Sequence, residues 1–245
     1  MCETCGCGIT DSTAGNHSES IRVIHDLMHN NDHQAKHNRE HFDRHGVLAI
    51  NLMSSPGAGK TRLLEATIDA LGDSAGLLVI EGDLETENDA ARIRNKGVPA
   101  VQITTGNACH LDASMVHEAL HDISLDGVNV LFIENVGNLV CPAAFDLGQH
   151  LNVVMLSVTE GDDKPAKYPV MFRTADVIIV SKCDLLQVID DFDPARASRA
   201  IADLGRKVPV IHTATGKAES IGPWLDWLSI NRSRHQPAAM SRGTV

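Results

Sequence analysis

The chain has 245 residues, the length of one compact domain with extensions or of two small domains, and 43% of its residues are hydrophobic. No apolar run approaches the ~20 residues of a membrane-spanning helix, and the N-terminus has neither the basic nor the apolar region of a secretory signal, so we expect a cytoplasmic protein without membrane association. The net charge of −11 argues against a general nucleic-acid binder, and the six Cys point to metal or redox chemistry instead of disulfides.

Residues 1–46 differ in composition from the rest of the chain. They hold three of the six Cys and seven of the 13 His, and after Met28 their only apolar residues are Ala35 and Phe42. Such a segment cannot bury enough apolar surface to fold alone. We therefore predict that 1–46 is a flexible, metal-binding extension and linker.

From residue 47 onward, apolar runs of strand length alternate with helical stretches. This pattern is typical of an α/β domain with a mostly parallel sheet flanked by helices, which we place at 47–230. The polar tail, 231–245, carries three Arg and no acidic residue, and we expect it to be disordered. The predicted strands are 47–55, 77–83, 100–106, 129–136, 151–158, 176–182 and 208–214. The predicted helices are 60–71, 87–96, 111–121, 194–204 and 217–228.

A phosphate-binding loop follows the first predicted strand. Residues 54–61 read SSPGAGKT, which matches the pattern G-x-x-x-x-G-K-[ST] except that Ser54 replaces the first Gly. Two glycines let backbone N–H groups turn towards phosphate oxygens, Lys60 would reach the β- and γ-phosphates, and the Thr61 hydroxyl would ligate Mg²⁺. The alternative is a glycine-rich strand–helix turn that binds nothing. The predicted phosphate-binding residues are Gly57, Ala58, Gly59, Lys60, Thr61 and Arg62.

Acidic residues at the ends of neighbouring strands would complete the magnesium site. Asp83 ends the second strand and Glu134 ends LFIE, and open α/β sheets bind ligands at these strand ends. Each carboxylate would hold a Mg²⁺-bound water, and the Gly137 N–H would face the γ-phosphate. A helix cap or a loop charge is the alternative for either acid. We predict Lys60, Asp83 and Glu134 as the catalytic residues.

The element Ser181-Lys-Cys-Asp184 follows another strand and predicts guanine recognition. The Asp184 carboxylate would accept both the N1–H and the N2–H of guanine, whereas adenine would leave this carboxylate unpaired, at a cost of a few kcal/mol. Lys182 would pack along the base. Chance occurrence after a strand is the alternative, since the tetrapeptide pattern is short.

Three thiols lie within the first seven residues. Cys2, Cys5 and Cys7, with the terminal amino group, make four soft donors that suit Ni²⁺, copper or Zn²⁺, and a planar arrangement would favour Ni²⁺. An incidental Cys-rich start is the alternative. The sequence leaves the identity of the metal open.

Cys109 and His110 stand together at a helix entrance, and Cys141 lies seven residues beyond Glu134. A lone Cys is usually a small buried hydrophobic residue, as we expect for Cys183, but adjacent Cys and His after a turn are typical of a metal corner. We predict a second metal site here, close to the nucleotide.

Six histidines recur at a spacing of four: His25, His29, His33, His37, His41 and His45. On a helix, residues i and i+4 are neighbours and can share an ion, but the row drifts by ~40° at each step, so six cannot form one straight face. Weak chelation by adjacent pairs and a solvated polar helix are equally supported.

In chain order, the MCxxCGCG start, the His-rich linker, SSPGAGKT, GD, GNACHLDA, ENVGNLVCPA and SKCDLL resemble the HypB family of hydrogenase nickel-insertion GTPases. The resemblance covers residues 1–8 and about 37–228. It implies a SIMIBI-type P-loop GTPase that works as a nucleotide-dependent homodimer, with GTP or GDP and Mg²⁺ as ligands. It also implies a tight nickel site at Cys2, Cys5 and Cys7, and a Zn²⁺ or Ni²⁺ site at Cys109, His110 and Cys141.

The implied partners are a nickel- and zinc-binding accessory protein of the HypA type and the hydrogenase large-subunit precursor. We expect slow GTP hydrolysis, because no assured arginine finger is evident. A urease-type nickel-delivery GTPase and a non-catalytic nickel storage protein are the two alternatives. The intact Lys60, Thr61 and Asp184 argue against the second.

Overall fold

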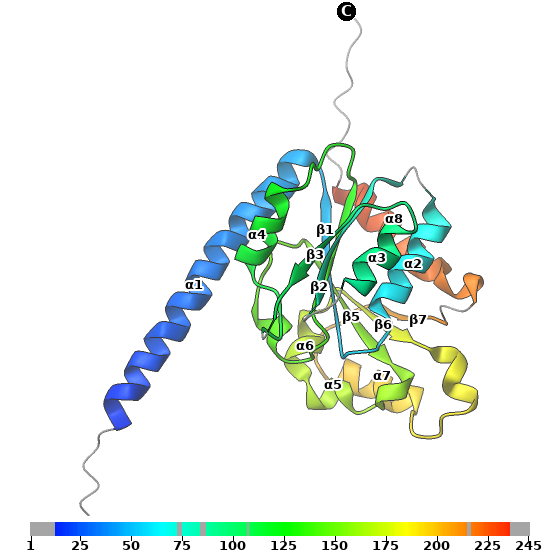
Figure 1. The fold of residues 1–245 in the computed structure, drawn as a ribbon. Coiled ribbons are helices and arrows are strands. Elements are labelled where there is room, and N and C mark those ends of the chain that lie inside the picture. The colour runs from blue at the N-terminus through cyan, green and yellow to red at the C-terminus, as the bar shows by residue number, and fades with distance from the viewer. Residues whose placement is uncertain (1–12, 73–74, 84–86, 107, 215–216, 236–245) are drawn as a thin grey trace, which may run out of the picture.

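The computed structural model describes residues 13–72, 75–83, 87–106, 108–214 and 217–235, so the predicted ligands Cys2, Cys5 and Cys7 lie outside the described residues. Seven parallel strands form one sheet in the order β3-β2-β4-β1-β5-β6-β7. The predicted class, an α/β fold with a parallel sheet flanked by helices, is confirmed (Figure 1). No helix of the described part is long and apolar enough to cross a membrane.

All seven predicted strands are present, each within a few residues of its expected bounds. The strands are β1 (Leu48–Ser54), β2 (Leu77–Asp83), β3 (Ala100–Thr104), β4 (Val130–Glu134), β5 (Leu151–Ser157), β6 (Val177–Ser181) and β7 (Val210–His212). The helices are α1 (Thr13–His45), α2 (Lys60–Leu71), α3 (Asn88–Arg94), α4 (Ala113–His121), α5 (Lys164–Lys167), α6 (Pro169–Thr174), α7 (Pro194–Ala202) and α8 (Gly222–His235).

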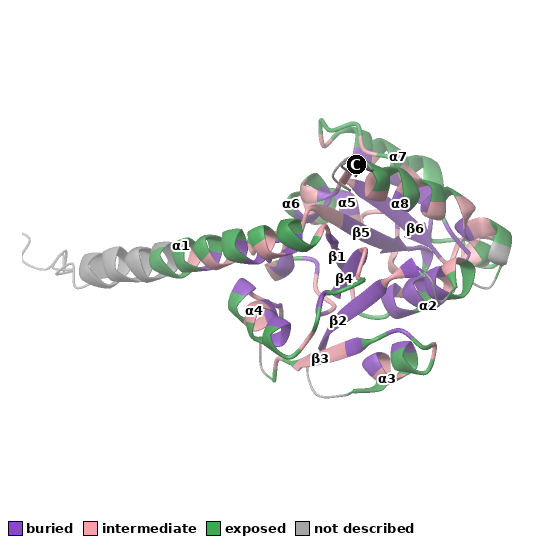
Figure 2. Cartoon of the chain, turned by 90° about the horizontal axis from the view of Figure 1, so that it is seen from above, coloured by how far each residue is buried: buried purple, intermediate pink, exposed green. Residues whose placement is uncertain are grey.

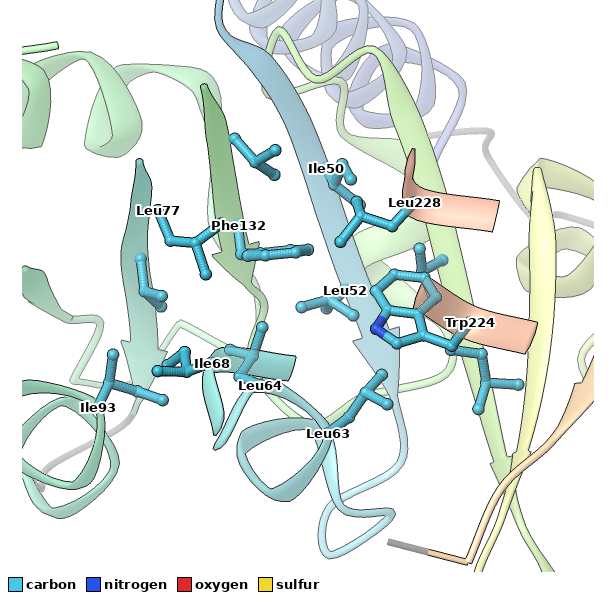
Figure 3. Close-up of a cluster of buried hydrophobic side chains, with 14 of the residues drawn as sticks. Ile50, Leu52, Leu63, Leu64, Ile68, Leu77, Ile93, Phe132, Trp224 and Leu228 are labelled. Atoms are coloured by element: carbon cyan, nitrogen blue, oxygen red, sulfur yellow. The ribbon is translucent and has the colours of Figure 1, made fainter. Parts of the chain in front are cut away.

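Alternate residues of each strand pack on opposite faces of the sheet, as the two-residue period of a strand requires. One face packs against α2, α3 and α8 through a cluster around Phe132 and Trp224, in which the Trp224 indole also donates a hydrogen bond to the Thr67 hydroxyl (2.9 Å). Figure 3 shows this cluster, and Figure 2 shows the buried sheet between the helical layers. The opposite face packs against α1 and α4 near β2 and β4, and against α6 and α7 near β5 and β6.

The structure corrects the predicted boundary at residue 46. Helix α1 runs to His45, and its second half packs against α4 and the sheet, with Ala35, Asn38 and Phe42 at 0% exposure (Figure 2). The Asn38 amide donates to the carbonyls of Ala113 (2.8 Å) and Leu147 (3.0 Å). Two apolar and two amide side chains at helical spacing thus help to attach a mostly polar helix, and Arg39 adds hydrogen bonds to the Asp146 carboxylate at 2.8 Å.

The first residues of the predicted disordered tail, 231–245, are helical in the structure, whereas 236–245 lie outside the described residues. Helix α8 continues through Asn231 to His235, so the first five residues of 231–245 are helical. Arg232, Arg234 and His235 occupy its last turn, where positive charge interacts favourably with the helix dipole. The composition of 231–245 shows that the segment is polar, but it does not show that two of its arginines lie in the last turn of a helix.

Candidate nucleotide and metal sites

The phosphate-binding loop lies between β1 and α2, at the carboxyl edge of the sheet. Gly57 and Gly59 have φ values of +73° and +98°, which L side chains rarely adopt, so both positions require glycine. Ala58 is buried and Arg62 is exposed, where its guanidinium pairs with Glu65 at 3.3 Å. The loop therefore has the backbone geometry that turns N–H groups towards an anion.

The first two residues of α2 contact the end of β4. The Thr61 hydroxyl donates to Glu134 Oε1 (2.9 Å), and Lys60 Nζ lies 3.8 Å from the same oxygen. Lys60 also donates to the Ser54 hydroxyl (3.3 Å), the residue that replaces the first glycine of the pattern. Thr61, Lys60 and Glu134 are all buried, so their interactions take place with little screening by water.

One of the two acids expected from the sequence, Glu134, contacts Thr61 and belongs to a cluster of three acidic residues. Glu81, Asp89 and Glu134 have carboxylate oxygens within 4.8 Å of one another, and Asp83 is not a member of this group. Glu81 and Glu134 are register partners on adjacent strands and point to the α2 face of the sheet. Sequence reasoning missed Glu81 because it chose the last acid of each strand, whereas the register decides which acids meet.

These carboxyl groups fit a hard divalent cation. Burial and the neighbouring Glu134 raise the pKa of Glu81, and burial raises the pKa of Glu134. Glu81 Oε2 and Glu134 Oε2 are buried without a hydrogen-bond partner, as are both polar atoms of Gln102, the register partner of Glu81 on β3. Unpaired carboxylate oxygens next to a buried hydroxyl are the ligand set that Mg²⁺ prefers, so the residues present fit this ion.

The predicted guanine-recognition element, residues 181–184, packs directly on the phosphate-binding loop. The Ser181 hydroxyl donates to the Ala58 carbonyl (2.7 Å), and Lys182 Nζ donates to the Gly57 carbonyl (2.8 Å). Lys182 has φ of +58°, a left-handed conformation found at no other non-glycine residue of the described segments. Asp184 follows and is exposed. The arrangement leaves the Asp184 carboxylate accessible to a base while the preceding residues are fixed.

Glu160, which sequence reasoning did not single out, also contacts the loop. The Ser55 hydroxyl donates to Glu160 Oε2 (2.7 Å), whereas Glu160 Oε1 is buried without a partner. Burial raises the pKa of this carboxyl group. It lies three residues after Ser157, the last residue of β5, so it follows a strand end as Glu134 terminates one.

Cys109, His110 and Cys141 converge although 32 positions separate the two cysteines. Their sulfur atoms lie 3.2 Å apart, Cys109 Sγ lies 3.7 Å from His110 Nδ1, and all three ligand atoms fall within 4.8 Å of one another. The His110 ring stacks on Phe145 with centroids 4.0 Å apart, and burial lowers its pKa, which favours the neutral ligand form. Two thiols and an imidazole suit Zn²⁺ or Ni²⁺.

Residues 134–141 connect the two sites. Gly137 packs against Pro56 of the phosphate-binding loop, and the Asn138 backbone N–H donates to the Ser54 carbonyl (2.8 Å). The Asn138 side chain in turn donates to the Cys109 carbonyl (3.2 Å). We call residues 134–141 the connecting segment, because it begins at Glu134 and ends at Cys141.

Three comparisons place the chain among known proteins. The sequence model of the family described as "CobW/HypB/UreG, nucleotide-binding domain" matches residues 48–212. The hydrogenase maturation factor HypB of Rhizobium leguminosarum is 50% identical over 217 residues, which cover 87% of this chain and 71% of that protein. The hydrogenase/urease maturation factor HypB of Helicobacter hepaticus is 46% identical, with 89% and 90% covered.

Two solved structures have the same fold. HypB from Helicobacter pylori in complex with nickel has a TM-score of 0.80 and 40% identity, covering 86% of this chain and 99% of that chain. HypB from Archaeoglobus fulgidus has a TM-score of 0.77 and 36% identity, covering 83% and 98%. The residues matched by the family model, 48–212, include all seven strands and both candidate sites of the described part.

Proposed function

The chain belongs to the HypB family of hydrogenase maturation factors, and we propose that it is a GTP-hydrolysing metallochaperone that delivers nickel during maturation of [NiFe]-hydrogenase. In this proposal, the GTP or GDP state is coupled to nickel binding at Cys109, His110 and Cys141 and to dimerisation of the chain. Cys2, Cys5 and Cys7 form a separate nickel site. The accessory protein of the HypA type and the hydrogenase large-subunit precursor are the proposed partners, in the cytoplasm.

One observation carries the proposal: the connecting segment contacts both sites at once. Asn138 bonds to Ser54 of the phosphate-binding loop and to Cys109 of the thiol site. A displacement of Gly137 or Asn138 by a γ-phosphate would therefore move Cys141 relative to Cys109. This displacement would change the metal affinity because the contacts between the metal and its ligands would then differ between the GTP and GDP forms.

GTP hydrolysis would proceed at the carboxyl edge of the sheet. Water attacks the γ-phosphorus, and the bond to the oxygen that bridges to the β-phosphate breaks, leaving GDP and phosphate. Lys60 would stabilise the charge on the β- and γ-phosphate oxygens, and the Gly137 N–H would donate to the γ-phosphate. Magnesium, held by Thr61 with Glu134 and Glu81, would neutralise phosphate charge. We expect slow turnover that resets the connecting segment.

The test is a nickel titration in the two nucleotide states. The chain should keep α1, because its second half is part of the folded body, and should carry Ala in place of Cys2, Cys5 and Cys7 to silence the terminal site. Nickel affinity should differ between the GDP form and the form with a non-hydrolysable GTP analogue, by a factor of about 5–150. By reciprocity, nickel must change the ratio of GTP to GDP affinity by the same factor.

The matched control is Cys141→Ala, which should abolish this difference while leaving nucleotide binding intact. Equal nickel affinity in both nucleotide states of the unaltered site would contradict the coupling. Measured phosphate release distinguishes the proposal from a non-catalytic nickel store, which would release none. Delivery to urease is a second candidate, since the Helicobacter hepaticus relative is described as a hydrogenase/urease maturation factor. In vitro activation of each apo-enzyme separates the two.

A further inference from the structure

Two peptide groups flank His110, and each of them is bound by an asparagine of the connecting segment. The Asn138 amide donates to the Cys109 carbonyl, which belongs to the peptide before His110 (3.2 Å). Asn135 Oδ1 accepts from the Leu111 backbone N–H, which belongs to the peptide after His110 (3.2 Å). The candidate metal ligand is therefore attached to the connecting segment on both sides.

The two attachments differ in their access to water. Asn135 is 1% exposed and Leu111 is 0% exposed, so the hydrogen bond between them lies in the interior. The hydrogen bond from Asn138 to Cys109 is exposed. Water can replace a partner that is lost at the surface, whereas a buried N–H that loses its acceptor stays unpaired. The attachment by Asn135 is therefore the one whose loss solvent cannot compensate.

Hydrogen bonds hold the Asn135 side chain in one orientation. Its Oδ1 also accepts from the Val136 N–H (3.0 Å), and its Nδ2 donates to Asn51 Oδ1 on β1 (3.2 Å), where Asn51 is fully buried. Its backbone N–H donates to the Leu52 carbonyl of the same strand (3.0 Å). Because two N–H donors meet one end of the amide and an acceptor meets the other, its oxygen and nitrogen have only one consistent assignment. The side chain is thus a rigid link between the sheet and Leu111.

Leu111 is also fixed through its own side chain. A Cβ atom at Gly82 would stand 2.8 Å from Leu111 Cδ1, so this side chain packs directly on the backbone of β2. The residue after His110 is thus held by packing on β2 and by a hydrogen bond from Asn135 at the end of β4. Rotation of the peptide between His110 and Leu111 would break this hydrogen bond, so the two contacts set the direction of the chain at His110.

We propose that Asn135 is the positioning residue of the metal site formed by Cys109, His110 and Cys141. By fixing the peptide after His110, it holds the imidazole beside the two thiols before the ion arrives. This role rests on the proposed binding of nickel by these three residues. Ligands that are already in place lose less conformational freedom when the metal binds, so a rigid support raises the metal affinity.

The two asparagines should then have separable effects on nickel. Asn138 donates its backbone N–H to the Ser54 carbonyl of the phosphate-binding loop (2.8 Å), so its position follows that loop. Asn135 is bound instead to Leu52 and Asn51 within the sheet. We therefore expect Asn135 to set the nickel affinity in every nucleotide state, and Asn138 to contribute to the difference between the GTP and GDP forms.

The test is a titration of the nucleotide-free full chain with Ni²⁺, with the terminal cysteine site silenced by alanine as above. Thiolate-to-nickel charge-transfer absorbance reports on the remaining site, because histidines elsewhere in the chain do not produce it. Asn135→Ala should weaken nickel binding about tenfold, since the Leu111 N–H loses its acceptor and His110 loses its support. Asn138→Ala should weaken it by a smaller factor, and should reduce the difference between the two nucleotide states.

Three further variants separate positioning from a general loss of stability. Asn38→Ala is the matched control: it removes an equally buried amide from α1, so it should lower the melting temperature and leave the nickel affinity unchanged. Asn135→Asp keeps an oxygen acceptor for the Leu111 N–H, so it should bind nickel at least as tightly as the unaltered site. Asn51→Ala removes the partner that orients Asn135, so it should weaken nickel binding in a chain that keeps this acceptor, even if Asn135→Ala does not fold.

The outcomes distinguish this proposal from the proposed function. Nickel affinity that is no weaker in Asn135→Ala than in Asn38→Ala, or no weaker in Asn51→Ala where the first variant does not fold, would overturn the role of Asn135 alone. A loss in Asn135→Asp as large as in Asn135→Ala would also overturn it, because the acceptor would then be irrelevant. An unaltered site that binds no nickel would overturn the proposed function together with this role.

Discussion

Gly137 lies so close to Pro56 that a Cβ atom at Gly137 would stand 2.7 Å from the Pro56 Cα. The single glycine of the connecting segment is therefore in van der Waals contact with the backbone of the phosphate-binding loop. Real Cβ atoms do not approach a backbone this closely, so any side chain at residue 137 must displace one of the two loops. The contact therefore couples the position of the connecting segment to that of the phosphate-binding loop.

Gly137→Ala should weaken GTP binding and the nucleotide dependence of nickel affinity. We expect overpacking of about 1–3 kcal/mol, which corresponds to roughly tenfold to a hundredfold in GTP affinity if the loop is displaced in the bound state. A fluorescent GTP analogue measures the loss. Gly222→Ala is the matched control, since nothing lies within 4 Å of its added Cβ and its backbone is helical. Similar GTP affinities for the two variants would show that the contact is irrelevant to binding.

Lys60→Ala should abolish GTP turnover while nucleotide-free nickel binding at Cys109, His110 and Cys141 persists. Loss of the charge that faces the phosphates should lower the rate of phosphate release at least about a hundredfold. Lys96→Ala, which removes an ion pair with Asp69 on the surface, is the control and should retain full activity. If Lys60→Ala also lost nickel at the thiol site, the two sites would not be separable in the way we describe.

Asp184→Asn should relax the preference for GTP over ATP. The amide offers guanine one donor where the carboxylate offered an acceptor, so discrimination should fall by about 1–3 kcal/mol, or roughly tenfold to a hundredfold. Competition of GTP and ATP for the bound fluorescent analogue provides the ratio. Asp190→Asn, also exposed and nearby in the chain, should leave the ratio unchanged. Equal affinity of the unaltered chain for both nucleotides would refute guanine recognition.

Glu81→Gln should make the stability of the nucleotide-free protein less dependent on pH. The pKa of Glu81 is raised from the ordinary value of 4.5 by burial and by Glu134, so the folded state holds a proton that the unfolded state releases above that pH. This contribution to stability is fully present below about pH 4.5 and is lost as pH rises towards the raised folded value, by up to about 1.4 kcal/mol per pH unit.

Urea unfolding at about pH 5.5 and about pH 8.5 measures the difference, since glutamine is neutral at both. Glu118→Gln, on the exposed face of α4, is the control and should keep the pH dependence of the unaltered chain. An unchanged difference in Glu81→Gln would mean that Glu81 is ionised in the folded protein. The same variant should weaken Mg²⁺-dependent GTP hydrolysis if Glu81 faces the ion.

Part of the candidate site could be predicted from short sequence motifs. The loop around Gly57 and Gly59, and the helix that begins at Lys60, depend on residues adjacent in the chain, so their spacing is sufficient to predict them. The seven strands followed from continuous apolar runs for the same reason. The packing of helix α1 was harder to predict, because Ala35 and Phe42 are the only apolar residues in its second half. Its attachment also depends on Asn31 and Asn38, which are polar but buried.

The sequence by itself determined the strand–loop–helix unit and the residue types available to bind a base or a metal, because each depends on short-range backbone geometry and side-chain chemistry. Only the tertiary structure decided which of these residues meet. Strand order places Glu81 beside Glu134, and it brings Cys109 within 3.2 Å of Cys141 across 32 positions of chain. Contacts between distant segments depend on register and packing of the whole sheet, and no local pattern encodes them.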